Sequence, residues 1–250
     1  MMDTPNKLTE GKTKIIYTHP EDAGLAVMIQ KDAISAGDGA RRNTIPGKGA
    51  LSGRTAANVF ALLNRHGIPT HFVAAPADDT MIVRRCRMIP LEVVMRRLAT
   101  GSYLKRQPET AEGERFDPVL VEFFVKDDAR HDPQMQPGEI TRDGIASADE
   151  IELMIERGRE VFAVLERAWA AQGIQLVDLK IEFGRTEDGT LLVADMIDND
   201  SWRLWPGGDK ARMLDKQIYR NMQDVTGEGL DLVKRKYEEV AALTELFERA

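Results

Sequence analysis

The chain has 250 residues, of which 42% are hydrophobic and 30% charged, proportions typical of a globular protein that buries a sizeable core. A formal net charge of −7 argues against the broad basic face that nucleic-acid binding requires, and no apolar run is long enough to cross a bilayer. The N-terminus lacks the apolar core of a signal peptide and the single Cys86 excludes an internal disulfide, so we expect a cytoplasmic protein whose partners include neither nucleic acid nor membrane.

The first motif in the chain, LTEGKTKIIY at 8–17, joins a turn to a β-branched run. It contains Gly-Lys-Thr, but a Walker loop requires a glycine where Asn6 stands and a helix after it, whereas the run at 15–17 favours a strand. We therefore predict a strand–turn–strand lid over phosphates, with an ordinary surface turn as the alternative. The residues of this lid that would contact phosphate are Gly11, Lys12 and Lys14.

A strand is predicted at 24–30, followed by the glycine-rich stretch KDAISAGDGARRNTIPGKG at 31–49. So many glycines among charged residues favour a long functional loop whose backbone approaches a ligand closely, and a mobile surface loop is the alternative. Helix formers dominate at 51–66, and Gly67 and Pro69 end that helix.

Further strands are predicted at 71–75 and 81–87, joined by a turn, after which Met88-Ile89-Pro90 interrupts the pattern. This interruption suggests that a second module begins there. We therefore divide the chain into an N-terminal lobe at 1–87, which carries the phosphate lid, and a C-terminal lobe at 88–250.

A cationic cluster follows the strand predicted at 92–97 and surrounds the glycine of ATGS. Its members are Arg96, Arg97, Ser102, Lys105 and Arg106. Guanidinium groups bind phosphate oxygens in pairs, and a hydroxyl and backbone amides complete such a cradle, so the cluster suits a phosphomonoester. Arginines that simply face water on an exposed strand are the alternative.

The apolar strand predicted at 118–126 ends in Lys126 and leads into the acidic turn DDARHDP. Its acids could supply metal ligands, and an ordinary polar turn is the alternative. The clearest helix lies at 148–172, where apolar residues recur at helical spacing behind a capping box of Ser147 and Glu150.

Two strands predicted at 177–183 and 191–197 flank an Asp-Gly turn and form a hairpin with one buried and one charged face. Residues two apart share a face, so the charged face gathers four side chains. These are Asp178, Lys180, Glu182 and Asp195. Magnesium prefers oxygen ligands and completes its shell with phosphates, and it would relieve the repulsion among the acids; a solvated polar face is the alternative.

The hairpin sequence LVDLKIEFG at 176–184, followed by ADMIDNDSWRLW at 194–205, closely resembles the SAICAR synthetase (phosphoribosylaminoimidazole-succinocarboxamide synthase) family, the ATP-dependent ligases of purine biosynthesis. The sequence IDNDSWRLWP is most similar to the synthetase half of the bifunctional animal enzyme. Many bacterial members have a second acid and a Ser-Pro-Asp turn where this chain has Met196 and Asp198-Asn199-Asp200.

The resemblance implies a role for each candidate residue. ATP would contact Gly11, Lys12, Lys14, Met88 and Lys126, and Mg²⁺ would bind Glu182 and Asp195. The substrates would contact Arg96, Ser102, Asp132, Asp200, Arg203, Lys216 and Arg220. The catalytic residues would be Asp178, Lys180 and Asp38, the first two orienting the reacting amino group and carboxylate.

By the same resemblance, the expected reaction joins L-aspartate to carboxyaminoimidazole ribonucleotide through an acyl phosphate made with ATP, giving SAICAR, ADP and phosphate. A small-molecule kinase with a similar nucleotide site and a non-catalytic nucleotide-binding paralogue are the alternatives. Helical segments predicted at 209–223 and 230–249 complete a two-layer α+β fold, ATP-grasp-like by resemblance, with antiparallel sheets in two lobes and the active cleft between them. We expect a homo-oligomer.

Overall fold

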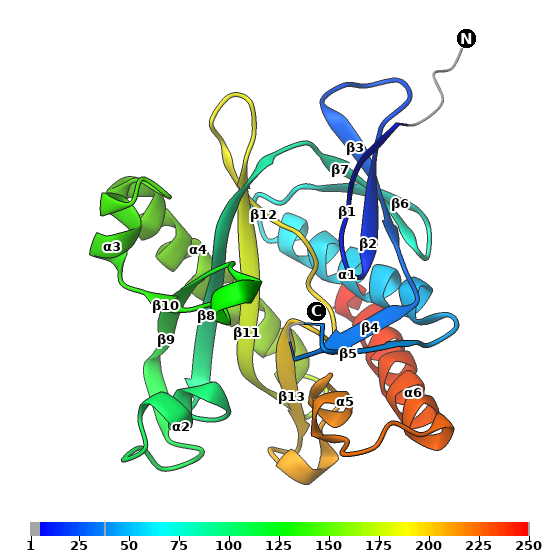
Figure 1. Ribbon diagram of the computed structural model, residues 1–250, viewed down its shortest axis with the longest axis vertical. Helices are drawn as coiled ribbons and strands as arrows, with labels where there is room; N and C mark the ends of the chain where they lie inside the picture. The colour runs from blue at the N-terminus through cyan, green and yellow to red at the C-terminus, as the bar shows by residue number, and fades with distance from the viewer. Residues whose placement is uncertain (1–5, 38, 250) are drawn as a thin grey trace.

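The computed structural model describes residues 6–37 and 39–249, which form an α+β protein built on two large antiparallel sheets (Figure 1). The first sheet has five strands in the order β1-β2-β3-β7-β6. They are β1 (Lys7–Glu10), β2 (Lys14–Thr18), β3 (Leu25–Gln30), β6 (Phe72–Ala77) and β7 (Thr80–Arg84). The strand–turn–strand predicted at 8–17 is the β1–β2 hairpin, in which the backbone N–H of Gly11 donates to the Lys14 carbonyl at 2.9 Å.

Helix α1 (Lys48–Arg65) packs on this sheet and lies close to the helix predicted at 51–66. Ala26 and Met28, on the buried face of β3, share a hydrophobic cluster with Phe60 of α1. At Gly53 the helix touches the β6–β7 turn so closely that a Cβ atom would overlap the carbonyl oxygen of Asp78. Only glycine permits this approach.

The second sheet has six strands and carries most of the predicted site residues. Its order is β10-β9-β8-β11-β12, with β13 also paired to β11. The strands are β8 (Arg87–Leu98), β9 (Arg115–Val125), β10 (Gln134–Met135), β11 (Ile174–Arg185), β12 (Leu191–Ala194) and β13 (Trp202–Pro206). Since β11 pairs with β8, β12 and β13, the strand with the alternating charges is braced on both edges.

Helix α4 (Ala148–Ala170) covers one face of the second sheet and confirms the helix predicted at 148–172. Its capping box is formed as predicted: Glu150 N–H donates to Ser147 Oγ at 3.2 Å, and Ser147 N–H donates to Glu150 Oε2 at 2.8 Å. Near the other end, Trp169 makes an edge contact with Trp202 at a centroid distance of 5.3 Å. Trp202 therefore anchors the start of β13 in the core.

The remaining elements are short except for the C-terminal helix. They are β4 (Ala33–Ala36), β5 (Arg41–Thr44), α2 (Ser102–Arg106), η1 (Asp128–Arg130), α3 (Pro137–Arg142), η2 (Lys210–Arg212), α5 (Gln217–Asn221), α6 (Gly227–Thr244) and η3 (Glu245–Arg249). The stretch expected to be a loop at 31–49 thus contains the β4–β5 hairpin. The single helix expected at 209–223 is broken, because Leu214 N–H donates instead to the Leu204 carbonyl of β13 at 3.1 Å.

The predicted interruption at Pro90 was wrong, because β8 runs through it without a break. The register between β11 and β8 shifts between Glu182 and Gly184, opposite this part of β8. Proline lacks an N–H donor and is tolerated where the ladder is already irregular.

The strand predicted at 191–197 ends at Ala194, and its expected alternation was also wrong. Leu192, Val193 and Ala194 are all buried. The N–H of Val193 donates to the Pro69 carbonyl at 3.0 Å, so a segment far away in the sequence pairs with the edge of β12, and the Val193 side chain belongs to the main hydrophobic cluster.

The alternation of β11 holds from Leu179 to Phe183 but not at Val177. A bulge against β13 lies between Leu176 and Asp178, and it moves Val177 into a separate cluster with Trp205. Bulges turn a side chain to the other face in this way.

The chain passes from the first sheet to the second between the end of β7 at Arg84 and the start of β8 at Arg87. Met28 of the first sheet and Val93 of the second nevertheless belong to one hydrophobic cluster. A division into domains at 1–87 and 88–250 therefore stays a prediction. In the part of the chain described, no helix has both the length and the apolar character that a membrane span requires.

Candidate active site

Residues of both sheets line two adjoining cavities. The first has a volume of ≈ 400 Å³, and its walls are largely apolar. Its apolar lining includes Ile16, Ala26, Met28, Val83, Met88 and Ala194. The second has a volume of ≈ 590 Å³ and mostly charged walls, which include the predicted residues Lys12, Asp132, Asp200, Lys216 and Arg220. An apolar cavity thus lies beside a highly charged one.

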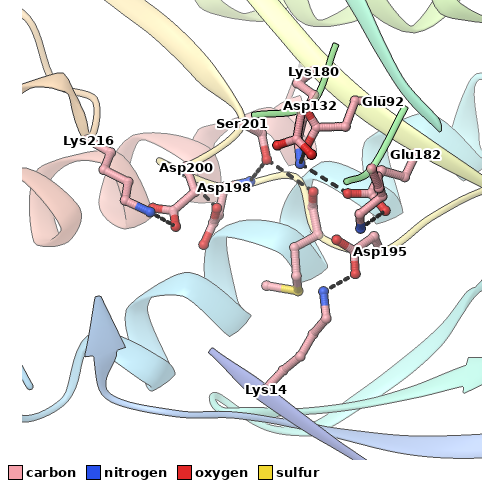
Figure 2. Close-up of polar contacts among 12 residues, drawn as sticks. Lys14, Glu92, Asp132, Lys180, Glu182, Asp195, Asp198, Asp200, Ser201 and Lys216 are labelled. Carbon is pink, nitrogen blue, oxygen red and sulfur yellow. Dashed lines mark hydrogen bonds and ion pairs between the residues drawn. The ribbon is translucent and has the colours of Figure 1, made fainter. Parts of the chain in front are cut away.

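Lys126, Glu182 and Asp195 line both cavities and form the wall between them. Glu182 pairs with Ala194 across β11 and β12, which places the next residue, Asp195, beside it (Figure 2). Lys126 Nζ donates to Glu182 Oε2 at 2.7 Å, and Lys14 forms an ion pair with Asp195. The structure therefore brings together the two carboxylates that the resemblance assigned to a metal.

The backbone of Asp195 is strained in a way that serves this arrangement. Its φ of 66° is in the left-handed region, which costs a residue other than glycine on the order of 1 kcal/mol or more. The turn ends β12 and directs the chain into the loop at 195–201. Such strain is typical of functional sites, where the surrounding structure imposes it.

Lysines surround the Glu182 carboxylate, which is only 2% exposed. Lys180 Nζ donates to Glu182 Oε1 at 3.0 Å and to Glu92 Oε1 at 3.0 Å. Burial alone would raise the pKa of Glu182, but the charges of Lys180 and Lys126 lower it to about 2. Burial would lower the pKa of Lys180, yet Glu182 and Glu92 raise it above its ordinary value. Both groups are therefore charged at neutral pH.

The loop at 195–201, between β12 and β13, is held by its own polar groups (Figure 2). Asp198 N–H donates to Ser201 Oγ at 3.2 Å, and Ser201 Oγ donates to the Met196 carbonyl at 3.0 Å. Asp200 N–H donates to Asp198 Oδ1 at 2.9 Å. Asp200 is thereby held against the polar cavity.

The predicted phosphate cluster forms only in part, at the other end of β11. Arg97 points to the opposite face of the sheet, where its Nε donates to Glu166 Oε1 of α4 at 2.7 Å, whereas Arg96 and Arg106 are already paired with carboxylates. Arg96, which is 3% exposed, donates through Nε to Glu122 Oε2 at 2.5 Å and through Nη1 to Asp178 Oδ2 at 2.9 Å. Arg203 of β13 also pairs with Asp178. Two predicted substrate-binding arginines and one predicted catalytic acid therefore form a single network.

Gly101, immediately before α2, lies against this network. Its φ is 61°, and a Cβ atom there would be 2.5 Å from Nη2 of Arg203. The absence of a side chain lets the backbone of Gly101 itself approach Arg203, directly before the exposed Ser102.

The other predicted residues lie as follows. Met88 is 40% exposed at the edge of the apolar cavity. Gly11 lies in the β1–β2 turn, next to Lys12 on the wall of the polar cavity. Asp38 lies outside the described residues.

Several residues that line the cavities were not predicted, among them the ionisable Glu92 and His71. Glu92 faces the polar cavity, and its signal in the sequence was a single acid in the apolar run of β8. His71 lines the apolar cavity, where burial, with a smaller effect of Lys14, lowers its pKa to about 3, so the imidazole is neutral. A histidine in a short apolar strand carries no signal of such a position.

An apolar cavity that meets a charged one across two carboxylates and several lysines is the arrangement of a nucleotide-dependent enzyme that acts on small anionic substrates. A model of the SAICAR synthetase family matches residues 7–236. The chain belongs to the SAICAR synthetase family, and the family resemblance is confirmed.

Individual relatives agree with this assignment. The chain is 68% identical over 244 residues to the phosphoribosylaminoimidazole-succinocarboxamide synthase of Roseiflexus sp. (strain RS-1), covering 98% of both chains. It is 47% identical over 236 residues to the bifunctional carboxylase and synthetase of Drosophila melanogaster, covering 92% of this chain and 55% of that protein. A solved type-2 SAICAR synthetase in complex with ADP has a TM-score of 0.81 and 34% identity, covering 92% of this chain and 97% of that one.

Proposed function

We propose that the protein is an ATP-dependent ligase that joins L-aspartate to carboxyaminoimidazole ribonucleotide and releases SAICAR, ADP and phosphate. The observation that carries this proposal is the wall of Lys126, Glu182 and Asp195 between an apolar and a charged cavity. A nucleotide in the first cavity would direct its terminal phosphoryl group at an acceptor in the second. Phosphoryl transfer depends mainly on such positioning and on charge neutralisation.

The apolar cavity would take the adenine base, with Met88 at its edge. Lys14 and Lys126 stand at its charged end and would offset the charge of the triphosphate. The β1–β2 turn, with Gly11 and Lys12, would lie over the phosphates. The ADP bound to the related type-2 enzyme supports a nucleotide site in this fold.

Glu182 and Asp195 would hold Mg²⁺ on the triphosphate. Among residues 6–37 and 39–249, no group of three or more His, Cys, Asp or Glu side chains is arranged to hold a metal ion. Two carboxylates on a shared wall fit an ion that takes one or two protein ligands and fills its shell with water and phosphate oxygens. Bound there, Mg²⁺ would neutralise developing charge on the phosphates.

The cluster at the other end of β11 would bind the ribose 5-phosphate of the ribonucleotide. Arg96 uses Nε and Nη1 for carboxylates and keeps further N–H donors, because a guanidinium has five. Arg203 and the hydroxyl of Ser102 would complete the site. Asp178 and Lys180, next along the same strand, would orient the amino group and the carboxylate of the imidazole.

The remaining charged residues of the polar cavity would bind L-aspartate. Lys216 and Arg220 would pair with its two carboxylates, and Asp132 and Asp200 would face its ammonium group.

The imidazole carboxylate attacks the γ-phosphorus, ADP departs, and an acyl phosphate forms. The unprotonated amine of aspartate then attacks the carbonyl carbon, phosphate leaves with the electron pair of the broken bond, and the nitrogen loses a proton. Asp38 as a catalytic residue stays a prediction, as do the cytoplasmic location and the homo-oligomer.

The test is to supply ATP, Mg²⁺, carboxyaminoimidazole ribonucleotide and L-aspartate and to measure phosphate release with each one omitted. The ligase requires all four, and SAICAR must accumulate in proportion to ADP. Full turnover without aspartate, with a phosphorylated product, would favour a kinase instead. Binding of ADP without turnover under any condition would favour the non-catalytic alternative.

A further inference from the structure

Asp200, on the wall of the polar cavity, has both carboxylate oxygens bound by neighbouring side chains. Oδ2 accepts from Lys216 Nζ at 2.6 Å (Figure 2), and Lys216 lines the polar cavity together with Asp200. Oδ1 accepts from the hydroxyl of Tyr237 at 2.5 Å. Tyr237 belongs to α6, which lies outside both large sheets (Figure 1). Tyr237, which does not itself line the cavity, is therefore bonded to an acid on the cavity wall.

The Tyr237 side chain is held firmly enough to act in this way. It is 1% exposed and lies in a cluster with Ile34 and Val233. Lys48 Nζ, from a side chain that is itself buried, lies 5.1 Å from the centre of the Tyr237 ring. Burial and the neighbouring Asp200 raise the pKa of the Tyr237 hydroxyl well above its ordinary value, so it remains a donor. Solvent does not reach this position to replace the bond.

Asp200 in turn is the ion-pair partner of Lys216. Burial lowers the pKa of Lys216, and the Asp200 carboxylate opposes that effect. An ammonium group has three N–H donors, and Asp200 takes one of them. The others are available to an anion in the cavity, provided that Asp200 keeps the ammonium group directed there.

We propose that Tyr237 is a positioning residue for the dicarboxylate substrate: its hydroxyl orients Asp200, and Asp200 holds Lys216 in place to bind a substrate carboxylate. The inference rests on the proposed function, since it takes aspartate as the ligand of this cavity. It assigns a binding role to α6, which is otherwise a covering helix. ATP lies on the other side of the shared wall and is not affected.

The test compares steady-state kinetics of the wild-type protein and Tyr237→Phe with each substrate varied. The variant is expected to raise KM for L-aspartate about tenfold, a loss of about 1.4 kcal/mol, with KM for ATP and kcat changed less than about twofold. If the wild-type protein forms no SAICAR, the proposed function fails. If the wild-type protein is active and Tyr237→Phe has an unchanged KM for aspartate, the inference alone fails.

Tyr219→Phe is the matched control. Tyr219 is fully buried in the same cluster and donates one hydrogen bond, to Asn43 Oδ1 at 2.7 Å. It should lose similar thermal stability without the selective rise in KM for aspartate. A rise of equal size in the control, or equal rises in all three KM values of Tyr237→Phe, would mean that Tyr237 is merely structural.

A second variant tests whether Tyr237 acts through Asp200, and this test does not depend on how well Tyr237→Phe folds. Asp200→Asn keeps the shape of the side chain but removes its charge, and it should also raise KM for aspartate selectively. An unchanged KM for aspartate in Asp200→Asn would exclude any action of Tyr237 through Asp200.

Discussion

Replacing Glu182 by glutamine should destabilise the ligand-free protein, although Glu182 belongs to the site. The carboxylate is 2% exposed, and Lys180 and Lys126 lower its pKa from 4.5 to about 2. At 1.36 kcal/mol per pKa unit, the charged form is stabilised by about 3 kcal/mol. Glutamine removes that charge, so Lys180 and Lys126 lose this anionic partner. The free energy of unfolding should therefore fall by about 3 kcal/mol, which corresponds to a decrease in Tm of roughly 6–12 °C for a chain of this size.

The assay is urea unfolding of the wild-type protein and Glu182→Gln without ligands at pH 7 and pH 3. A lowered acid pKa contributes stability that is complete above 4.5 and lost as the pH falls towards 2, so the deficit should shrink by more than half by about pH 3. Glu92→Gln is the control, because Glu92 shares Lys180 but its side chain is 23% exposed, and its deficit should be less than about half as large. Equal stability of Glu182→Gln and wild type at pH 7, or a deficit unchanged at pH 3, would refute the reasoning.

Three further substitutions test other parts of the structure. Asp195→Asn should lower kcat by at least about 100-fold with an unchanged circular dichroism spectrum, and near-normal turnover would remove Asp195 from the metal site. Arg96→Ala removes one of the two cationic partners of each of two buried carboxylates, since Glu122 keeps Arg106 and Asp178 keeps Arg203. It should lower the free energy of unfolding by about 1–3 kcal/mol while raising KM for the ribonucleotide; a change confined to KM for ATP would mean that the two anion sites are exchanged. Gly53→Ala should cost about 2–3 kcal/mol in urea unfolding because its Cβ overlaps Asp78, whereas Gly138→Ala in α3 has open space and should change stability by less than about 1 kcal/mol. Equal costs at the two glycines would contradict the close approach of α1 to the β6–β7 turn.

Local signals in the sequence were enough where neighbouring residues decide the structure. The capping box of Ser147 and Glu150 and the apolar spacing behind it predicted α4 almost to its ends. The alternation from Leu179 to Phe183 predicted the core of β11. In both cases the contacts that matter lie within a few residues along the chain.

Predictions failed where a distant segment decides the outcome. The side chains of β12 are buried on successive residues, and its backbone at Val193 bonds to the distant segment at Pro69; no pattern within 191–197 indicates either contact. The hairpin in 31–49 was missed because its glycines favour a loop.

The site shows the same limit. Asp178, Lys180 and Glu182 were predicted together because one strand carries them. Tyr237 and its bond to Asp200 join residues far apart in the chain, and a tyrosine in an amphipathic helix looks like packing alone.

The central strand β11 also has a consequence for substrate length. Asp178 and Glu182 lie at the proposed phosphate end and the proposed metal end of the site, and four residues of extended chain span about 13 Å. Because β11 is paired on both edges, the distance between Asp178 and Glu182 is fixed, and it sets the length of substrate that can contact both ends. A ribonucleotide analogue that is a few ångströms shorter or longer would contact one of the two ends but not the other. Such an analogue would bind poorly, and this selection requires no conformational change.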